Sequence, residues 1–127
     1  MKIKSIASKA VFLVLVAAAV CLSAPDTHTV TVKGYVLDSA CAFTKGLSQP
    51  ISKECATSCA NAGSQLVILA SDGTIYWPIA DTMPASGQNS RLLPFAGDRV
   101  TVSGKIYMRG GSKAIVIEKI EAQAPQK

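Results

Sequence analysis

Five short segments rich in β-branched and other apolar residues constrain the fold of this 127-residue chain more than any other feature. In the first, residues 29–37, Val30 and Val32 alternate with Thr31 and Lys33, a period of two that is typical of a half-buried strand. Four later segments of similar composition predict further strands, over residues 65–70, 74–79, 99–108 and 113–120. The chain is therefore expected to be mainly β.

Turn residues connect these strands in pairs. Residues 71–73 (Ser-Asp-Gly) join the second and third strands, and residues 109–112 (Arg-Gly-Gly-Ser) join the fourth and fifth, so each pair predicts a hairpin. Pro78 makes the end of the third strand an edge or an exit from the sheet. Gly34 and Gly104 lie inside the first and fourth strands, where they predict bends as these strands curl around a small barrel.

Two helical segments complete the predicted fold. Ser52 is a suitable N-cap for a helix over residues 53–62, and Gly63 ends it, whereas residues 39–50 predict a loop. Residues 90–96 predict a single helical turn. The expected fold is a small five-stranded OB-like barrel with one inserted cysteine-bearing helix and a short helical turn before the last hairpin. An incomplete β-sandwich is the alternative.

The start of the chain has the composition of a secretory signal peptide. A basic beginning precedes the uncharged residues 10–22, which at about 1.5 Å per helical residue are too short for a bilayer core of about 30 Å. We therefore expect export to the periplasm or the medium; a lipid anchor through Cys21 is the alternative. The expected organisation is a signal peptide at 1–23, a linker at 24–28, the barrel domain at 29–121 and a flexible tail at 122–127.

The charge distribution and the missing motifs exclude several classes of function. The formal net charge is +5, but residues 24–127 carry ten Lys or Arg against eight Asp or Glu, so no nucleic-acid partner is expected. His28 is the one histidine, which leaves Ser-His-Asp catalysis almost without support. No glycine loop for phosphate is present. The sequence favours a non-enzymatic binding or accessory module, whose partner is a small ligand or another exported protein.

The cysteines are the strongest chemical feature of the mature chain. If Cys21 leaves with the leader, Cys41, Cys55 and Cys59 remain, and an exported chain is expected to form one disulfide. Cys55 and Cys59 are four residues apart on the predicted helix, so their Cβ atoms are about 6 Å apart, which is farther than a disulfide prefers. A bond from Cys41 to either of them is therefore easier than a bond between the two. Such a bond closes a loop of about fifteen residues and stabilises by about 3 kcal/mol. The third cysteine is then a small buried apolar residue.

Two alternatives to this disulfide remain open. Cys41, Cys55 and Cys59 together resemble a three-thiolate site for Cu(I) or zinc, with Asp38 or His28 as a fourth ligand. Thiol–disulfide exchange is the third hypothesis, although the Cys-x-x-x-Cys spacing differs from the two-residue spacing of the known redox motif.

Aromatic residues on the predicted strands offer a second candidate site. They are expected either to line a ligand groove on the barrel wall or to fill the core. The residues of this possible binding face are Tyr35, Tyr76, Trp77 and Tyr107.

Three motifs together resemble an uncharacterised family of small exported bacterial proteins, common in acidobacteria, with OB-like folds. Residues 34–41 fit its G-x-V-x-D-S-x-C pattern, Cys55 and Cys59 fit its C-x-x-x-C, and residues 97–104 fit its G-x-x-V-x-V-x-G. The relatives often carry a histidine between the first Cys and the C-x-x-x-C, and residues 42–54 contain none. The resemblance implies an OB-like fold and a periplasmic or surface location, without an established activity.

Overall fold

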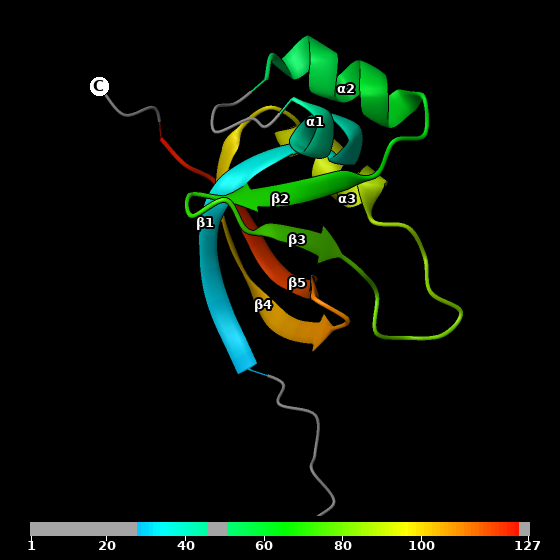
Figure 1. Ribbon diagram of the computed structural model, residues 1–127, viewed down its shortest axis with the longest axis vertical. Coiled ribbons are helices and arrows are strands. Elements are labelled where there is room, and N and C mark those ends of the chain that lie inside the picture. The colour runs from blue at the N-terminus through cyan, green and yellow to red at the C-terminus, as the bar shows by residue number, and fades with distance from the viewer. Residues whose placement is uncertain (1–27, 46–50, 125–127) are drawn as a thin grey trace, which may run out of the picture.

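Five strands close into a barrel in the computed structural model, which describes residues 28–45 and 51–124. Around the barrel the strand order is β1-β2-β3-β5-β4, and β4 pairs with β1 to complete the closure (Figure 1). All pairs are antiparallel except β3 with β5, which is parallel. The strands are β1 His28–Asp38, β2 Leu66–Ala70, β3 Ile75–Pro78, β4 Arg99–Arg109 and β5 Ser112–Ala122. The expected mainly β, five-stranded OB-like barrel is confirmed.

β1 makes closure possible because it pairs with a different strand in each half. Residues 28–35 pair with β4, and residues 34–38 pair with β2. At the junction, a Cβ on Gly34 would collide with the backbone carbonyl of Leu69 in β2. Gly104 allows the same close approach between β4 and β5, next to a shift in their register. The two strands therefore bend at glycines, as the sequence predicts.

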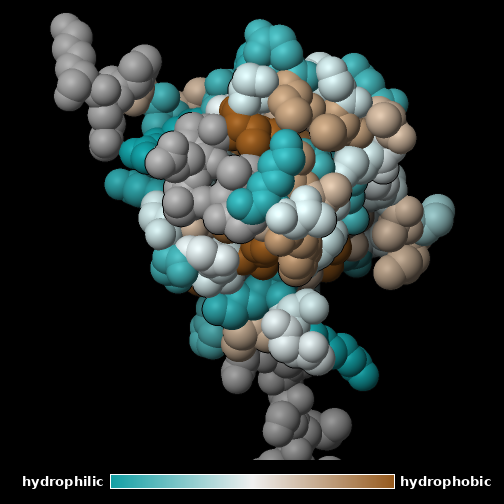
Figure 2. All heavy atoms as spheres, turned by 45° about the horizontal axis from the view of Figure 1, so that its top comes forward, coloured by the Kyte–Doolittle hydropathy of each residue, from teal (hydrophilic) through white to brown (hydrophobic). Residues whose placement is uncertain are grey.

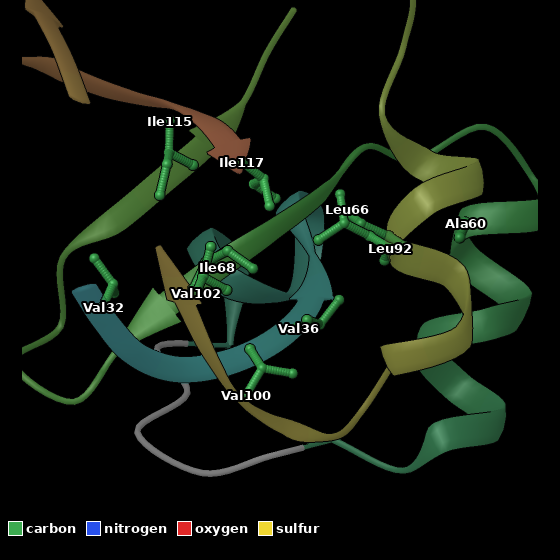
Figure 3. Close-up of a cluster of buried hydrophobic side chains, with 10 residues drawn as sticks. All are labelled: Val32, Val36, Ala60, Leu66, Ile68, Leu92, Val100, Val102, Ile115 and Ile117. Atoms are coloured by element: carbon green, nitrogen blue, oxygen red, sulfur yellow. The ribbon is translucent and has the colours of Figure 1, made fainter. Parts of the chain in front are cut away.

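Among the described residues, the buried side chains of the barrel interior are all aliphatic. Alternate residues of the strands point inward, and Ala60 and Leu92, from two different helices, close the end of the cluster (Figure 3). The buried members are Val32, Val36, Ala60, Leu66, Ile68, Leu92, Val100, Val102, Ile115 and Ile117.

A second, smaller apolar cluster lies outside the barrel, on the outer face of β1 and β2. Leu37, Val67 and Leu69 point away from the barrel interior, and Cys41 and Ala42 cover them. β2 is thus apolar on both faces, which explains its uninterrupted Leu-Val-Ile-Leu run. This outer cluster seats the helical segment that carries Cys41.

Two helices, and not one, are inserted between β1 and β2, and both lie above one end of the barrel (Figure 1). The first lies inside the stretch predicted as a loop, because Asp38 caps it and Cys41 and Ala42 bury against the sheet. The expected turn before the last hairpin is present as a short α-helix followed by a 3-10 turn. These elements are α1 Ser39–Thr44, α2 Lys53–Asn61, α3 Asn89–Leu92 and η1 Leu93–Phe95.

The ends of the chain differ in part from the expected organisation. His28, expected in the linker, pairs with Ile106 as the first residue of β1, and Ala122, expected in the tail, pairs with Val100 as the last residue of β5. The expected signal peptide and Cys21 lie outside the described residues. Among the helices of the described segments, none has the length and apolar character needed to cross a membrane.

Candidate metal centre

Three cysteines from two helices meet at one place. Cys41 lies on α1, and Cys55 and Cys59 lie one turn apart on α2. All three Sγ atoms lie within 4.8 Å of one another. The three cysteines therefore lie close enough to share one site, although Cys41 reaches the cluster from a helix of its own.

The three cysteines are free thiols, so the expected disulfide through Cys41 is not formed. Cys41 is buried, whereas Cys55 and Cys59 are half-buried. A disulfide holds its sulfurs about 2.05 Å apart, and no cysteine pair among the described residues is joined in this way.

The same capping arrangement positions a cysteine in the first turn of each helix. The backbone N–H of Cys41 donates to Asp38 Oδ2 (3.0 Å), and the backbone N–H of Cys55 donates to Ser52 Oγ (3.1 Å). Both caps precede their cysteine by three residues, which is the spacing at which an N-cap side chain reaches a free N–H of the first turn. Local hydrogen bonding therefore fixes the places of two of the three thiols.

Asp38 is a fully buried carboxylate at the edge of the thiol cluster. Its Oδ2 accepts hydrogen bonds from the Cys41 backbone and from the Ser64 hydroxyl (3.3 Å). Its Oδ1 is buried and has no hydrogen-bond partner among the described residues. An unpartnered buried polar atom costs about 1–3 kcal/mol, so this oxygen needs an explanation.

The carboxylate and the thiols shift one another's pKa values. Burial by itself raises the pKa of Asp38, but hydrogen bonds, chiefly from Cys41 and Ser64, outweigh burial and lower it. The nearby carboxylate stabilises the protonated Cys41 thiol and, with desolvation, raises its pKa to about 11. Desolvation and the negative charge of Asp38 also raise the pKa of Cys59. Hydrogen bonding to the carboxylate, desolvation and the negative charge of Asp38 together account for both thiol shifts.

Contacts from the rest of the barrel hold α2 in place. Lys53, the first residue of α2, forms an ion pair with Asp98 (3.1 Å) and donates to the Pro94 carbonyl (3.3 Å). Gly97 has a positive φ of 78°, and a Cβ there would meet the Lys53 backbone at 2.8 Å, so only glycine fits this contact. At the other end of α2, the Asn89 side chain donates to the Ser64 carbonyl (2.8 Å).

His28, the other candidate fourth ligand, lies away from the cysteines. It pairs with Ile106, whereas the end of β1 that leads into α1 carries Asp38. It lines a separate apolar surface hollow together with Val30 and Met108. The structure therefore brings the three cysteines together, places Asp38 next to them through its hydrogen bond to the Cys41 backbone, and leaves out His28.

The four aromatic residues do not form one binding face. Tyr76 and Trp77 are neighbours on β3, so Tyr76 packs against the barrel interior and Trp77 against the outer cluster. Tyr35 also packs against the outer cluster, and its ring lies 4.9 Å from the Arg99 guanidinium. Tyr107 is half-buried on β4, where it pairs with Ala114.

Phe43 is a site residue that the sequence analysis did not identify. It is 63% exposed, and its ring stacks on Trp77 with centroids 6.0 Å apart. The two rings line a surface hollow of about 420 Å³ that Lys113 also borders. The hollow lies outside the thiol cluster, but α1 carries both Cys41 and Phe43. On the face that brings α1 and α2 forward, hydrophobic residues show as small patches among polar ones (Figure 2).

Comparisons of the chain with family models, with curated proteins and with solved structures find no match. The functional argument therefore depends on the site alone. Its chemistry is that of three convergent thiols beside one buried carboxylate, held by two capped helices on a closed barrel.

Proposed function

We propose that this protein binds one soft or borderline metal ion, Cu(I) or zinc, through the thiolates of Cys41, Cys55 and Cys59. The observation that carries the proposal is the gathering of all three Sγ atoms within 4.8 Å. Zn–S bonds of about 2.3 Å place the sulfurs of a tetrahedral site about 3.8 Å apart, so closing around an ion requires a shift of about 1 Å or less. Side-chain rotation supplies a movement of this size.

The number of cysteines favours a metal over a disulfide. One disulfide uses two sulfurs and leaves the third unexplained beside it, whereas one ion uses all three. The raised thiol pKa values of Cys41 and Cys59 disfavour a thiol-exchange function, because the thiolate is the attacking species. A bound cation stabilises the same thiolates that the carboxylate destabilises.

The location remains part of the proposal. The basic start and the short apolar run before residue 24 favour export, and an exported thiol cluster needs protection from oxidation. Metal coordination gives that protection, because ligated thiolates are less available to oxidants. We therefore infer an exported metal-binding module rather than an enzyme.

The test is an anaerobic purification of the mature chain, followed by thiol counting and metal analysis. We expect three thiols per chain, counted after denaturation, and one equivalent of zinc or Cu(I). Cys55→Ser or Cys59→Ser is expected to lower the affinity at least tenfold, whereas Ser58→Ala, an exposed neighbour on α2, leaves it unchanged. One free thiol and no metal would instead establish the disulfide, and reversible exchange with a dithiol would establish a redox role.

A second candidate function is the binding of a small ligand at the hollow beside Trp77. The exposed Phe43 ring and the Lys113 side chain favour it, since they offer a planar ring an aromatic surface and a cation. Titration of a panel of nucleotides and oligosaccharides, followed by Trp77 fluorescence, tests this candidate. Saturable binding that Phe43→Ala removes supports it, and no response to any member of the panel counts against it.

A further inference from the structure

One oxygen of the Asp38 carboxylate is without a role in the fold. Oδ2 accepts from the Cys41 N–H at 3.0 Å and from the Ser64 hydroxyl at 3.3 Å. Oδ1 has no partner among the described residues, and the side chain is 0% exposed. Buried polar atoms in native proteins nearly always have a partner. Oδ1 is therefore an acceptor without a hydrogen-bonded partner among the described residues, and the thiols of Cys41 and Cys59 are the groups besides Ser64 that interact with this carboxylate.

Helix capping does not account for this second oxygen. Ser52 caps α2 with a single neutral oxygen, which accepts from the Cys55 N–H at 3.1 Å, and it does so while exposed. Asp38 performs the same task for α1 with Oδ2 alone. Asp38, which is fully buried, thus carries one oxygen and one negative charge that the exposed cap Ser52 does not have. A charge is not buried at a position where a neutral cap suffices unless something offsets it.

The position of the carboxylate points to what offsets it. Asp38 Oδ2 accepts from the Cys41 backbone N–H at 3.0 Å, and the sulfur of Cys41 lies within 4.8 Å of the sulfurs of Cys55 and Cys59. An ion held by the three sulfurs would thus lie next to the free oxygen. The donors at this place are three sulfurs, which form one compact group, and beside them the buried Asp38 oxygen that has no partner.

This donor set distinguishes zinc from Cu(I). Zinc is borderline in softness, takes four ligands in a tetrahedron and accepts carboxylate oxygen together with cysteine sulfur. Cu(I) selects soft sulfur ligands and gains little from a carboxylate. Zinc also carries the larger positive charge, which better offsets three thiolates and a buried carboxylate.

We infer that the metal is zinc and that Asp38 Oδ1 completes a closed tetrahedral site with Cys41, Cys55 and Cys59. The inference rests on the proposed function and adds the identity of the ion and its fourth ligand. Oδ2 keeps its hydrogen bond to the start of α1, so Asp38 is a one-oxygen ligand and a helix cap at once. Such a site has no open position for an exogenous ligand, which makes it structural in character.

Cobalt substitution tests whether the fourth position is closed. The reduced full chain is loaded with Co²⁺ under anaerobic conditions, and its visible absorption is recorded before and after azide is added. We expect a tetrahedral thiolate spectrum that azide leaves unchanged in the unaltered protein. In Asp38→Asn and Asp38→Ser, which retain a capping oxygen, we expect azide to enter the vacated position and shift the bands.

Affinity measurements test the choice of metal. We expect Asp38→Asn to lower zinc affinity by about tenfold or more. Losses of this size follow even the removal of groups that only orient the metal ligands. The same variant should change Cu(I) affinity much less, so the preference for zinc over Cu(I) falls. Asp72→Asn is the matched control, because Asp72 Oδ1 also accepts a backbone N–H, from Thr74 at 2.9 Å. It should change neither affinity.

The outcomes separate this inference from the proposed function. If the unaltered chain binds neither ion, the proposed function fails and this inference fails with it. If it binds zinc and both Asp38 variants bind equally well, or if it binds Cu(I) alone, the thiolate site stands and the role of Asp38 is overturned. If the variants do not fold, the azide response of the unaltered cobalt protein decides, because a shift there shows an open position.

Discussion

The interior of the barrel and the helical layer above its end are held together by different forces. Inside the barrel every buried side chain of the main cluster is aliphatic. The five strands are hydrogen-bonded to one another in a closed ring. The helical layer holds the three thiols on helices of six and nine residues, next to the Asp38 carboxylate at the end of β1. Helices this short are not stable by themselves in water. We therefore expect the barrel, which we call the frame, to fold without a metal. The helical layer depends on its helix caps, on its contacts with the barrel and, as we propose, on an ion.

The largest expected effect tests the independence of the frame. Ile115 is fully buried in the interior, and Ile115→Ala should lower the free energy of unfolding by about 3 kcal/mol, from lost burial and the cavity left behind. Chemical denaturation measures the loss. The variant should still bind one equivalent of metal while it is folded. Loss of metal binding in the folded variant would show that the two regions are not separable.

Metal binding is expected to act on the helical layer with nearly the same magnitude. Zinc at a free concentration 100 times its dissociation constant should raise the free energy of unfolding by about 2.7 kcal/mol, because it binds only the folded chain. Thermal unfolding with and without a chelator measures the change. Cys59→Ser should remove most of the stabilisation, and an equal zinc effect in that variant would contradict the proposed site.

The stability of the metal-free protein should depend on pH through Cys41, which belongs to the helical layer and not to the barrel interior. The folded pKa of this thiol is raised to about 11, so its contribution to stability is complete below the pKa of the unfolded thiol. It is lost as pH rises from about 9 toward 11, by at most about 1.4 kcal/mol per pH unit. Comparing the stabilities of the unaltered chain and Cys41→Ala over this range isolates the effect from other titrations. Parallel curves for the two proteins would show that the pKa of Cys41 is not raised.

Metal affinity should change with pH in the opposite direction. The thiols must lose their protons to bind an ion, and the pKa values of Cys41 and Cys59 are raised. We therefore expect apparent zinc affinity to increase from pH 6 to pH 9 in a competition titration. Affinity that is constant over this range would mean that the thiols are not the ligands.

The helix caps should have a moderate effect that is confined to the layer. Ser52→Ala removes the side-chain acceptor of the Cys55 N–H and should lower stability by about 1 kcal/mol. Hydrogen exchange should increase in α2 and stay unchanged in β4 and β5. Ser58→Ala, exposed in the body of the same helix, is the control and should not destabilise. Increased exchange throughout the barrel would mean that the layer and the frame unfold as one unit.

The smallest expected effect concerns the aromatic pair at the edge of the layer. Phe43→Ala removes the ring that stacks on Trp77, and since Phe43 is 63% exposed the loss should be about 0.5 kcal/mol. Denaturation followed by fluorescence measures it. Met83→Ala, another exposed apolar residue, is the control. A loss of stability several times larger would show that the aromatic pair is needed to hold α1 against the barrel.

The frame could be predicted from the sequence because its physics is local and periodic. Alternation on β1 and β4, and the turns at 71–73 and 109–112, locate every strand to within about two residues. The helix α1 was missed because its six residues show no period, and it depends on the Asp38 cap and on burial of Cys41 against β1 and β2. Such an element is specified by tertiary contacts rather than by its own composition.

The candidate site was predicted in its members but not in its environment. The four-residue spacing of Cys55 and Cys59 was sufficient to place them on one helix face, and Cys41 was expected nearby. One oxygen of Asp38 is buried without a partner because of the way in which β1, α1 and Ser64 pack together. No local sequence pattern encodes this packing. The Phe43–Trp77 stack is hidden for the same reason, since its rings come from distant parts of the sequence.

The double pairing of β1 has a consequence for the order in which the molecule is made. β1 pairs with β4 over residues 28–35, but β4 is joined to β3 only through β5, so the barrel remains open during synthesis until β5 has been added. The cysteines between 41 and 59 emerge long before that segment. Contacts so distant in sequence form slowly, and the nascent chain therefore passes through a stage in which its sulfurs are present but not yet gathered. We therefore expect the proposed ion to be loaded late, after the ring of strands has closed.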